Sequence, residues 1–414
     1  MLRASLLVFT ALLTGVALAH APDPQQNNPR SIPLNPKDPT YNMWKQFRDT
    51  SKDAKREPGL IHVHKYIGGF AWHGISTFFK LPVALNPQDL IAGKTDVAIV
   101  GAPLDMSLGM RGAAFGPKSL RSSDRYLGYG ALSMPHMHVL INPFEVLTIA
   151  DYGDIAVDPL STERSMEHIR ETVRQIAETK TIPIIVGGDH SLMYPDVAGL
   201  ADVYGKGTIG VVHFDAHYDA SKNVMGHLIS HGSPVYRLIK EGHVKGKNFI
   251  QVGLRGYYPD KKSFEWMRKE GFKYHTMAEI DKKGWPTTMK EVLAEARDGT
   301  KYLFISLDID VLDPAFTPGT GTPEPAGLTT RELFPLIRSL CAENNVVGFE
   351  LVEINPLTDP GYTTTLNANR LLRECLTGMA MRKKGITDGS YLSPLTKEHG
   401  SPLSIDKKTP PKKP

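Results

Sequence analysis

The sequence predicts an α/β fold built on a parallel sheet, and two observations carry this prediction. Short apolar runs rich in Val and Ile recur along the chain, bounded by Gly, Pro or Asp, as is typical of strands buried on both faces of a sheet. Amphipathic helical patterns separate the runs, as at 163–180 and 330–344. This alternation indicates βαβ units with helices on both faces. The runs are 96–103, 146–154, 181–190, 208–217, 248–255, 302–313 and 346–356.

The chain begins with a pattern typical of a secretory signal peptide. Arg3 precedes the apolar run 6–18, and residues 17–19 read Ala-Leu-Ala, which fits a cleavage site. The run is shorter than the roughly 20 residues that a transmembrane helix needs. We therefore expect residues 1–19 to be removed and the protein to enter the secretory pathway, as a secreted or vacuolar protein with no membrane segment after cleavage. An uncleaved N-terminal anchor is the alternative.

Composition divides the remainder of the chain into three parts. Residues 20–60 are rich in Pro, Asn, Gln and charge and are expected to form an extended N-terminal arm. Residues 383–414 contain seven lysines and are expected to form a disordered basic tail, which leaves 61–382 as one domain. The leader and the tail account for the net charge of +4, so the body of the chain is close to neutral. A basic face for nucleic acid is therefore excluded.

The cysteine content excludes a disulfide scaffold, since the chain has only two. Cys341 and Cys375 each lie in an apolar helical stretch. Free cysteines pack well in cores, so the sequence favours two separate buried thiols. A single disulfide between them is the alternative.

Polar side chains that can bind metal or act in catalysis follow several of the apolar runs, directly at their carboxyl ends. They include Asp189-His190, the 215–220 segment DAHYDA, Asp308-Ile309-Asp310 and Glu353. Open α/β sheets bind ligands outside the carboxyl ends of their strands. We therefore expect these segments, far apart in sequence, to converge on one crevice.

The residue types in these segments point to bound metal. Asp215, His217 and Asp219 occur at a spacing of two, which would place them on one side of an extended strand end. Asp308 and Asp310 are expected to share one strand face in the same way. Adjacent ionised carboxylates repel each other, and a divalent cation relieves the repulsion. For DAHYDA alone, an ordinary polar loop is the alternative.

The pooled candidate ligands are two imidazoles and four carboxylates. Such an oxygen-rich set without thiolate suits a pair of ions such as Mn²⁺, which activate a shared water. The six residues are His190, Asp215, His217, Asp219, Asp308 and Asp310.

Three of the motifs resemble the signatures of the ureohydrolase family of arginases and agmatinases. They are GGDHS at 187–191, FDAHYDA at 214–220 and the long stretch SLDIDVLDPAFTPGTGTPEPAGL at 306–328. The segments 73–85 (HGISTFFKLPVAL) and 109–121 (GMRGAAFGPKSLR) resemble the agmatinase-like branch in particular. The resemblance extends over most of the chain, from about Gly69 to Met381.

The resemblance implies a three-layer α/β/α arginase-like fold with an eight-stranded, mostly parallel sheet. It implies two Mn²⁺ ions per subunit, held by the six residues above, and a homo-oligomer, either a trimer or a hexamer. Asp219 would also accept a hydrogen bond from the attacking water. Glu353 would bind the substrate guanidinium and Thr322 would orient Glu353. His231 would contact the substrate and relay a proton to the leaving amine.

The activity implied by the resemblance is that of a hydrolase in polyamine metabolism, cleaving the guanidino group of agmatine to urea and putrescine. The alternatives are 4-guanidinobutyrate or arginine as the small guanidino substrate, or a non-catalytic metal-binding relative. Lys222 is a candidate cation for a substrate carboxylate. Ala114 stands where the family stretch Gly-Ala-Arg-Phe-Gly-Pro has Arg, a departure that bears on subunit contacts and specificity.

Overall fold

The computed structural model describes residues 34–46, 56–64, 74–123 and 133–397. The predicted leader, much of the predicted arm and the end of the chain lie outside these residues. The chain divides into two compact units, residues 1–43 and 44–414. In the described part of the first unit, the backbone forms turns such as Asp38 N to Asn35 O. No helix in the described ranges is long and apolar enough to cross a bilayer.

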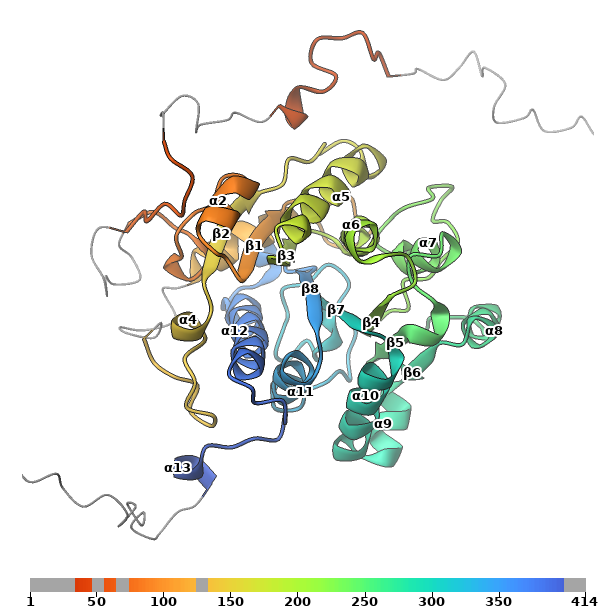
Figure 1. Cartoon of the computed structure of the whole chain (residues 1–414). Helices are drawn as coiled ribbons and strands as arrows, with labels where there is room; N and C mark the ends of the chain where they lie inside the picture. The colour runs from red at the N-terminus through yellow and green to blue at the C-terminus, as the bar shows by residue number, and fades with distance from the viewer. Residues whose placement is uncertain (1–33, 47–55, 65–73, 124–132, 398–414) are drawn as a thin grey trace, which may run out of the picture. The chain divides into compact units, whose positions relative to one another are not determined.

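The larger unit is built on one sheet of eight strands, as the resemblance implies (Figure 1). Every strand pair in it is parallel, and the spatial order is β2-β1-β3-β8-β7-β4-β5-β6. The strands are β1 (Val97–Ala102), β2 (Ile149–Asp154), β3 (Ile182–Gly187), β4 (Ile209–Phe214), β5 (Phe249–Val252), β6 (Lys273–His275), β7 (Tyr302–Asp308) and β8 (Val346–Val352).

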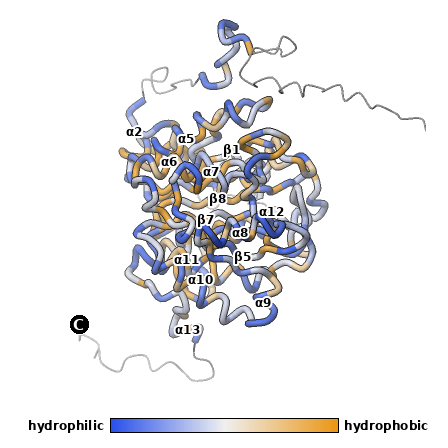
Figure 2. The backbone as a smooth tube through the Cα atoms, turned by 90° about the vertical axis from the view of Figure 1, so that its right-hand side faces the viewer, coloured by the Kyte–Doolittle hydropathy of each residue, from blue (hydrophilic) through white to orange (hydrophobic). Residues whose placement is uncertain are grey.

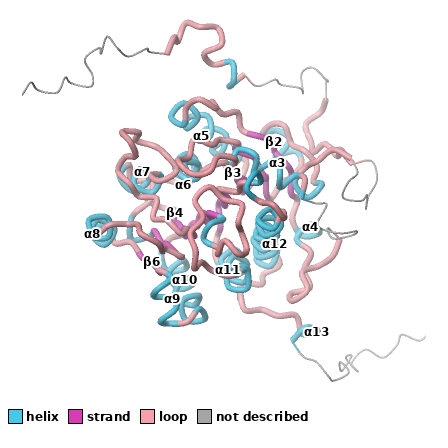
Figure 3. The backbone as a smooth tube through the Cα atoms, turned by 180° about the vertical axis from the view of Figure 1, so that it is seen from behind, coloured by secondary structure: helices cyan, strands magenta, loops and turns pink. Residues whose placement is uncertain are grey.

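Helices cover both faces of the sheet, so the architecture is the predicted three-layer α/β/α arrangement (Figures 1 and 3). The α-helices are α2 (Pro87–Ala92), α3 (Gly116–Arg121), α4 (Pro143–Val146), α5 (Thr162–Glu178), α6 (Met193–Tyr204), α7 (Pro234–Lys240), α8 (Lys261–Glu270), α9 (Met277–Lys283), α10 (Trp285–Gly299), α11 (Thr330–Glu343), α12 (Thr363–Lys383) and α13 (Pro394–Lys397). Short 3₁₀ helices are Met43–Lys45, Phe78–Lys80, Ala113–Phe115, His190–Leu192, Gly246–Asn248, Ile309–Val311 and Pro356–Thr358.

Two hydrophobic cores lie on opposite faces of the sheet, because successive strand side chains point to opposite sides. In β4, Val212 and Phe214 belong to the core beneath α10, α11 and α12. Ile209 and Val211 belong to the core beneath α5 and α6. The strands are therefore apolar on both faces, and the hydrophobic stretches of the chain concentrate in the interior of the unit (Figure 2).

The sequence located seven of the eight strands and missed β6. This edge strand has only three residues, Lys-Tyr-His, and therefore lacks the apolar run by which the others were found. The start of the predicted tail is also corrected. Gly389 N donates to Glu343 Oε1, and Ser393 N donates to the backbone oxygen of His138. The chain beyond 383 thus remains bonded to the domain, at least to Ser393.

Both cysteines are buried and free, as the sequence favours, but they are not separate. Cys341 on α11 and Cys375 on α12 place their sulfur atoms 2.9 Å apart. The helices α11 and α12 pack against each other, which brings the two apolar stretches together.

A substitution of Leu372 on α12 tests how much the packing of this helical layer contributes to the stability of the fold. Its side chain is fully buried in the core beneath α11 and α12. Truncating a buried Leu costs about 2–5 kcal/mol, since it removes apolar contacts and leaves a cavity. Leu372→Ala should therefore lower the apparent Tm by several degrees in a thermal melt followed by circular dichroism. Leu160→Ala, at a position 85% exposed, is the matched control and should leave the melt unchanged.

Candidate metal centre

The four central strands of the sheet bring the predicted site segments together. In the order β3-β8-β7-β4 these strands are direct neighbours. His190 follows β3, Glu353 follows β8, Asp308 ends β7 and Asp215 follows β4. Since all four strands are parallel, these residues lie at one edge of the sheet. The convergence that the strand ends predicted is therefore present.

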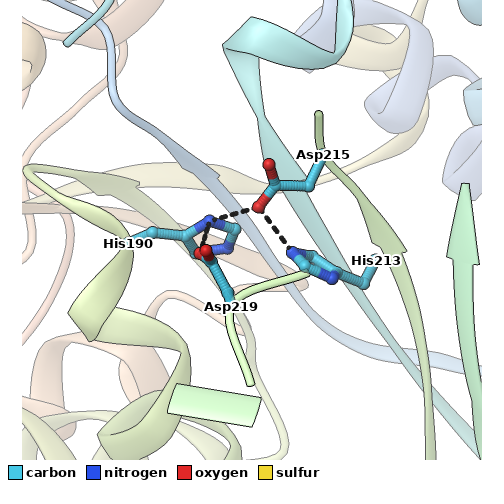
Figure 4. A group of neighbouring side chains, drawn as sticks. All are labelled: His190, His213, Asp215 and Asp219. Atoms are coloured by element: carbon cyan, nitrogen blue, oxygen red, sulfur yellow. Dashed lines mark hydrogen bonds and ion pairs between the residues drawn. The ribbon is translucent and has the colours of Figure 1, made fainter. Parts of the chain in front are cut away.

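His190 lies at the centre of a cluster of three carboxylates. Its Nδ1 atom is 3.1 Å from a carboxylate oxygen of each of Asp215, Asp219 and Asp308. Figure 4 shows the carboxylates of Asp215 and Asp219 directed toward the ring. All of these side chains are at least nine-tenths buried.

This geometry fits a cation better than a hydrogen-bond network. One ring nitrogen carries at most one hydrogen, which can be shared with only one of three acceptors at full strength. Buried carboxylates that lack compensating partners are strongly unfavourable. A divalent ion placed among these atoms would satisfy the imidazole nitrogen and the oxygens together. The donor set, which is rich in oxygen and contains imidazole, suits manganese.

A second group of ligand atoms shares Asp215 with the first. His217 Nδ1 lies 3.1 Å from Asp310 Oδ2 and 3.4 Å from Asp215 Oδ1. The other oxygen of Asp215 faces His190. The two carboxylate oxygens of one residue thus serve two adjacent groups, as a pair of neighbouring ions requires. The His217 side chain is 25% exposed, so the site opens to solvent on this side.

The local backbone that presents these side chains differs from the predicted alternation along strands. β4 ends at Phe214, before DAHYDA, and Asp219 has a φ of 45°. β7 ends at Asp308, and Asp310 lies in the 3₁₀ turn Ile309–Val311. Asp308 Oδ1 accepts a hydrogen bond from Asp310 N and holds that turn. The expectation that strand pleat aligns these residues is therefore wrong, although they do converge.

The loop after β3 depends on a close backbone approach at Gly188. A Cβ atom at this position would lie 1.8 Å from the backbone oxygen of Leu104, so no larger residue fits. Asp189, the next residue, accepts hydrogen bonds from Ser191 N and Met106 N. These contacts fix the direction in which the chain enters the turn at His190.

Ser306 and Gln251, which support the ligands, were not identified from the sequence. Ser306 Oγ lies 2.8 Å from His190 Nε2 and sets the ring orientation. Its place two residues before Asp308 on the same strand is a signal that could have found it. His213 lies on β4 two residues before Asp215, and its Nε2 lies 2.9 Å from Asp215 Oδ2 (Figure 4). Gln251 holds the other nitrogen of that ring.

Glu353 and His231 form a pair beside the cluster. Glu353 is 1% exposed and has a φ of 60°, a strained conformation for a residue with a side chain. Its Oε1 accepts a hydrogen bond from His190 N at 3.0 Å and lies 3.5 Å from His231 Nδ1. Its Oε2 is buried and has no hydrogen-bond partner among the described residues. One carboxylate oxygen is thus anchored, and the other remains available for a ligand.

Thr322 does not make the contact that was expected of it. Its hydroxyl donates a hydrogen bond to Asp310 Oδ2 at 3.4 Å and not to Glu353. Asp310 is one of the candidate metal ligands. Glu353 is oriented instead by the backbone of His190. The interpretation of Thr322 as the residue that orients Glu353 is therefore replaced by a contact to Asp310.

The electrostatics of the cluster reflect its excess of negative charge. Burial, and then the charges of Asp310 and Asp215, raise the pKa of Asp308 well above its usual value. Burial and the charge of Asp215 also raise the pKa of Asp219. Burial has the same tendency at Asp215, but hydrogen bonds from three histidines outweigh it and lower the pKa well below the usual value. The raised pKa values of Asp308 and Asp219 thus reflect an excess of negative charge that a bound cation would compensate.

Comparisons with known proteins agree with this geometry. A family model described as "Arginase family" matches residues 95–378, more than half of the chain. The chain belongs to the arginase family. It is 37% identical to a mitochondrial agmatinase from Gallus gallus over 73% of this chain and 85% of that protein. It is 36% identical to a mitochondrial guanidino acid hydrolase from Homo sapiens over 73% and 82% of the two chains.

A solved structure supports the same assignment. The proclavaminate amidino hydrolase from Streptomyces clavuligerus superposes with a TM-score of 0.66 at 29% identity, covering 76% of this chain and 100% of that one. The protein is therefore an arginase-family enzyme that hydrolyses carbon–nitrogen bonds. Its His and Asp cluster at the carboxyl edge of the sheet is the place where this chemistry can occur.

Asp215 lies between the two groups of ligands in this arginase-family site, so the assignment of ligands can be tested by measuring metal content. Asp215 contributes an oxygen to both groups of ligands, whereas Asp310 contributes to one. After loading with Mn²⁺ and dialysis, Asp215→Asn should lose about two ions per chain relative to the wild type, and Asp310→Asn about one. The measurement is elemental analysis by mass spectrometry. Asp388→Asn, remote from the cluster in sequence and structure, is the control; equal manganese in all four proteins contradicts the assignment.

Proposed function

We propose that this protein hydrolyses the guanidino group of agmatine to urea and putrescine, using two Mn²⁺ ions held by the cluster of two histidines and four aspartates. The observation that carries the proposal is the free oxygen of Glu353. Its Oε2 is buried without a partner among the described residues, next to that cluster. A buried carboxylate needs a cationic partner, and a planar guanidinium matches it.

The ions, when bound, supply a water activated for attack on the guanidinium carbon. Glu353 binds the guanidinium and fixes its plane, since its own position is set by the backbone of His190. The water adds to the central carbon and gives up both of its protons, the bond from this carbon to the alkyl-substituted nitrogen breaks, and that nitrogen gains two protons. Urea and an alkylammonium ion result, so the atoms and the single positive charge of the guanidinium are conserved.

His231 is suited to deliver the proton to the leaving amine. Burial tends to lower the pKa of this imidazole, but the hydrogen bond with Glu353 and the charges of Glu353, Asp219 and Asp189 outweigh burial and raise it to about 9. The ring is therefore protonated at neutral pH. The imidazolium carries a hydrogen on Nδ1, which lies 3.5 Å from Oε1 of Glu353 and can pass to the leaving amine. This is the position of a general acid at the guanidinium.

A guanidino acid such as 4-guanidinobutyrate is the second candidate substrate, and one observation favours it. Arg111 is exposed on the loop 105–112, which contacts the site through Leu108 and His231. Arg111 Nη1 donates to the backbone oxygen of Asp105, and the other N–H groups of its exposed guanidinium can bind a substrate carboxylate. The similarity to a guanidino acid hydrolase supports the same substrate class.

Release of urea distinguishes these substrates. The Mn²⁺-loaded protein should be assayed in parallel with agmatine, 4-guanidinobutyrate and L-arginine, by colorimetric detection of urea. We expect the highest kcat/KM with agmatine. A preference for 4-guanidinobutyrate that declines in Arg111→Ala would replace agmatine by the guanidino acid, while the reaction itself would stand.

Variants of the site test the reaction independently of the substrate. Asp310→Ala should abolish urea release, since it removes a ligand of the second group. Glu353→Gln should reduce kcat/KM about 100-fold or more, because loss of one partner of a buried charge pair costs several kcal/mol. Asp388→Asn should match the wild type. Full activity of Asp310→Ala with each substrate would refute the proposed mechanism.

We further propose that residues 1–19 act as a cleaved secretory leader. The support is the sequence pattern alone, an apolar run followed by Ala-Leu-Ala at 17–19. Protein isolated from its own source should then begin at His20, which N-terminal sequencing and intact mass will determine. An intact mass that includes residues 1–19 counts against the leader, without bearing on the enzymatic proposal.

A further inference from the structure

A second cluster of ligand-type side chains lies at the far edge of the sheet. β6 is the last strand, separated from β4 and its Asp215 by β5. His275 ends β6, Glu279 lies on α9, and Glu291 and Glu295 lie on α10. In Figure 1, α9 and α10 are neighbours beside β5 and β6. This cluster is distinct from the centre formed at β3, β8, β7 and β4.

The three carboxylates are arranged around the imidazole ring of His275. His275 Nδ1 lies 3.8 Å from Glu279 Oε1 and 3.8 Å from Glu291 Oε2. His275 Nε2, on the other side of the ring, lies 3.1 Å from Glu295 Oε2. The spacing follows from the helices, because Glu291 and Glu295 are four residues apart and therefore lie on one face of α10.

One nitrogen of the imidazole is available as a metal ligand. His275 is 4% exposed, and its Nδ1 is buried with no hydrogen-bond partner among the described residues. Its Nε2 is occupied by the hydrogen bond to Glu295, so the ring hydrogen resides there. The lone pair of Nδ1 is thus directed at two carboxylates, and no described residue donates a hydrogen bond to it.

The same arrangement is the usual one for a histidine that binds metal. Such a histidine presents one nitrogen to the ion and donates its other N–H to a carboxylate, which fixes the ring. Here Glu295 has the position of that carboxylate. Tetrahedral ligands at the bond lengths of zinc lie about 3.4 Å apart. The distances of 3.8 Å from Nδ1 to each carboxylate need only a small adjustment to meet this value.

Lys283 is the group that an ion would have to displace. Its Nζ atom lies 2.5 Å from Glu279 Oε1 and 2.9 Å from Glu291 Oε2. It balances the carboxylates but leaves Nδ1 of His275 without a partner. The lysine side chain is 39% exposed and can move into solvent at modest cost, since exposed ion pairs contribute little.

We propose that His275 Nδ1, Glu279 and Glu291 bind a divalent transition-metal ion, with Zn²⁺ as the first candidate, and that Glu295 orients the imidazole. Zinc accepts both imidazole nitrogen and carboxylate oxygen as ligands, and a fourth position would be taken by water. A cavity of about 760 Å³, lined by these residues and by Lys283, gives the ion and its water access from solvent. The ion would join edge strand β6 to α9 and α10.

Zinc content and zinc position together test this site in the full-length, Mn²⁺-loaded protein. After exposure to Zn²⁺ and dialysis, elemental analysis should find about one zinc ion fewer per chain in Glu291→Gln than in the wild type. Glu291 is 37% exposed and Gln has nearly its shape, so the variant should fold. Glu265→Gln, on the exposed face of α8, is the matched control and should bind zinc like the wild type.

Anomalous diffraction at the zinc edge locates the ion independently of exchange at the Asp215 centre. We expect a peak between His275, Glu279 and Glu291 in wild-type crystals and no such peak in Glu291→Gln. Equal zinc contents in the three proteins, or anomalous peaks confined to the centre at Asp215, would overturn the proposal. Neither result would alter the expected release of urea, which depends on the other centre.

Discussion

The mutual repulsion of buried carboxylates at the end of the central strands is the constraint on which the rest of the structure depends. Asp215, Asp219 and Asp308 place oxygens around one imidazole nitrogen in a region with almost no solvent. In a medium of low dielectric constant, such a cluster is unfavourable unless positive charge compensates it. A cation is therefore bound most favourably at the edge of the sheet where these four parallel strands end together.

The surrounding residues keep this cluster from relaxing. His213 and Gln251 hold Asp215 from within the sheet, and Ser306 holds the far side of His190. Glu353 has a left-handed backbone conformation that its side chain disfavours, but Glu353 N is bonded to Gly188 O and its carboxylate to His190 N. Strain at this position is tolerated because several contacts determine it at once. A site of this kind is rigid before any ligand arrives.

Much of this organisation could be predicted from the sequence, and the exceptions have physical reasons. Strands buried on both faces read as apolar runs, and reactive residues at their ends locate the site. The sequence did not predict β6, because a three-residue edge strand needs no apolar run. The contact of Thr322 with Asp310 was not predicted, because Asp310 lies in a turn whose geometry cannot be derived from residue spacing. The cluster of His275 was missed because its members are joined only by the packing of α9 and α10.

The guanidino substrate cannot be predicted from the sequence for a related reason. In the proposed reaction, every guanidino compound presents the same planar cation to Glu353, so that contact cannot discriminate among them. Discrimination falls to the far end of the substrate and to the loop 105–112, whose position is set by distant parts of the chain. Asn355 binds the backbone oxygens of Met110 and Arg111, and Met110 N donates to Gly321 O. A site that pairs with a polar substrate group strongly rejects substrates that lack it, whereas apolar contacts discriminate weakly. In the proposed reaction, the preference between agmatine and a guanidino acid would therefore depend on whether this tethered loop offers Arg111 to the substrate.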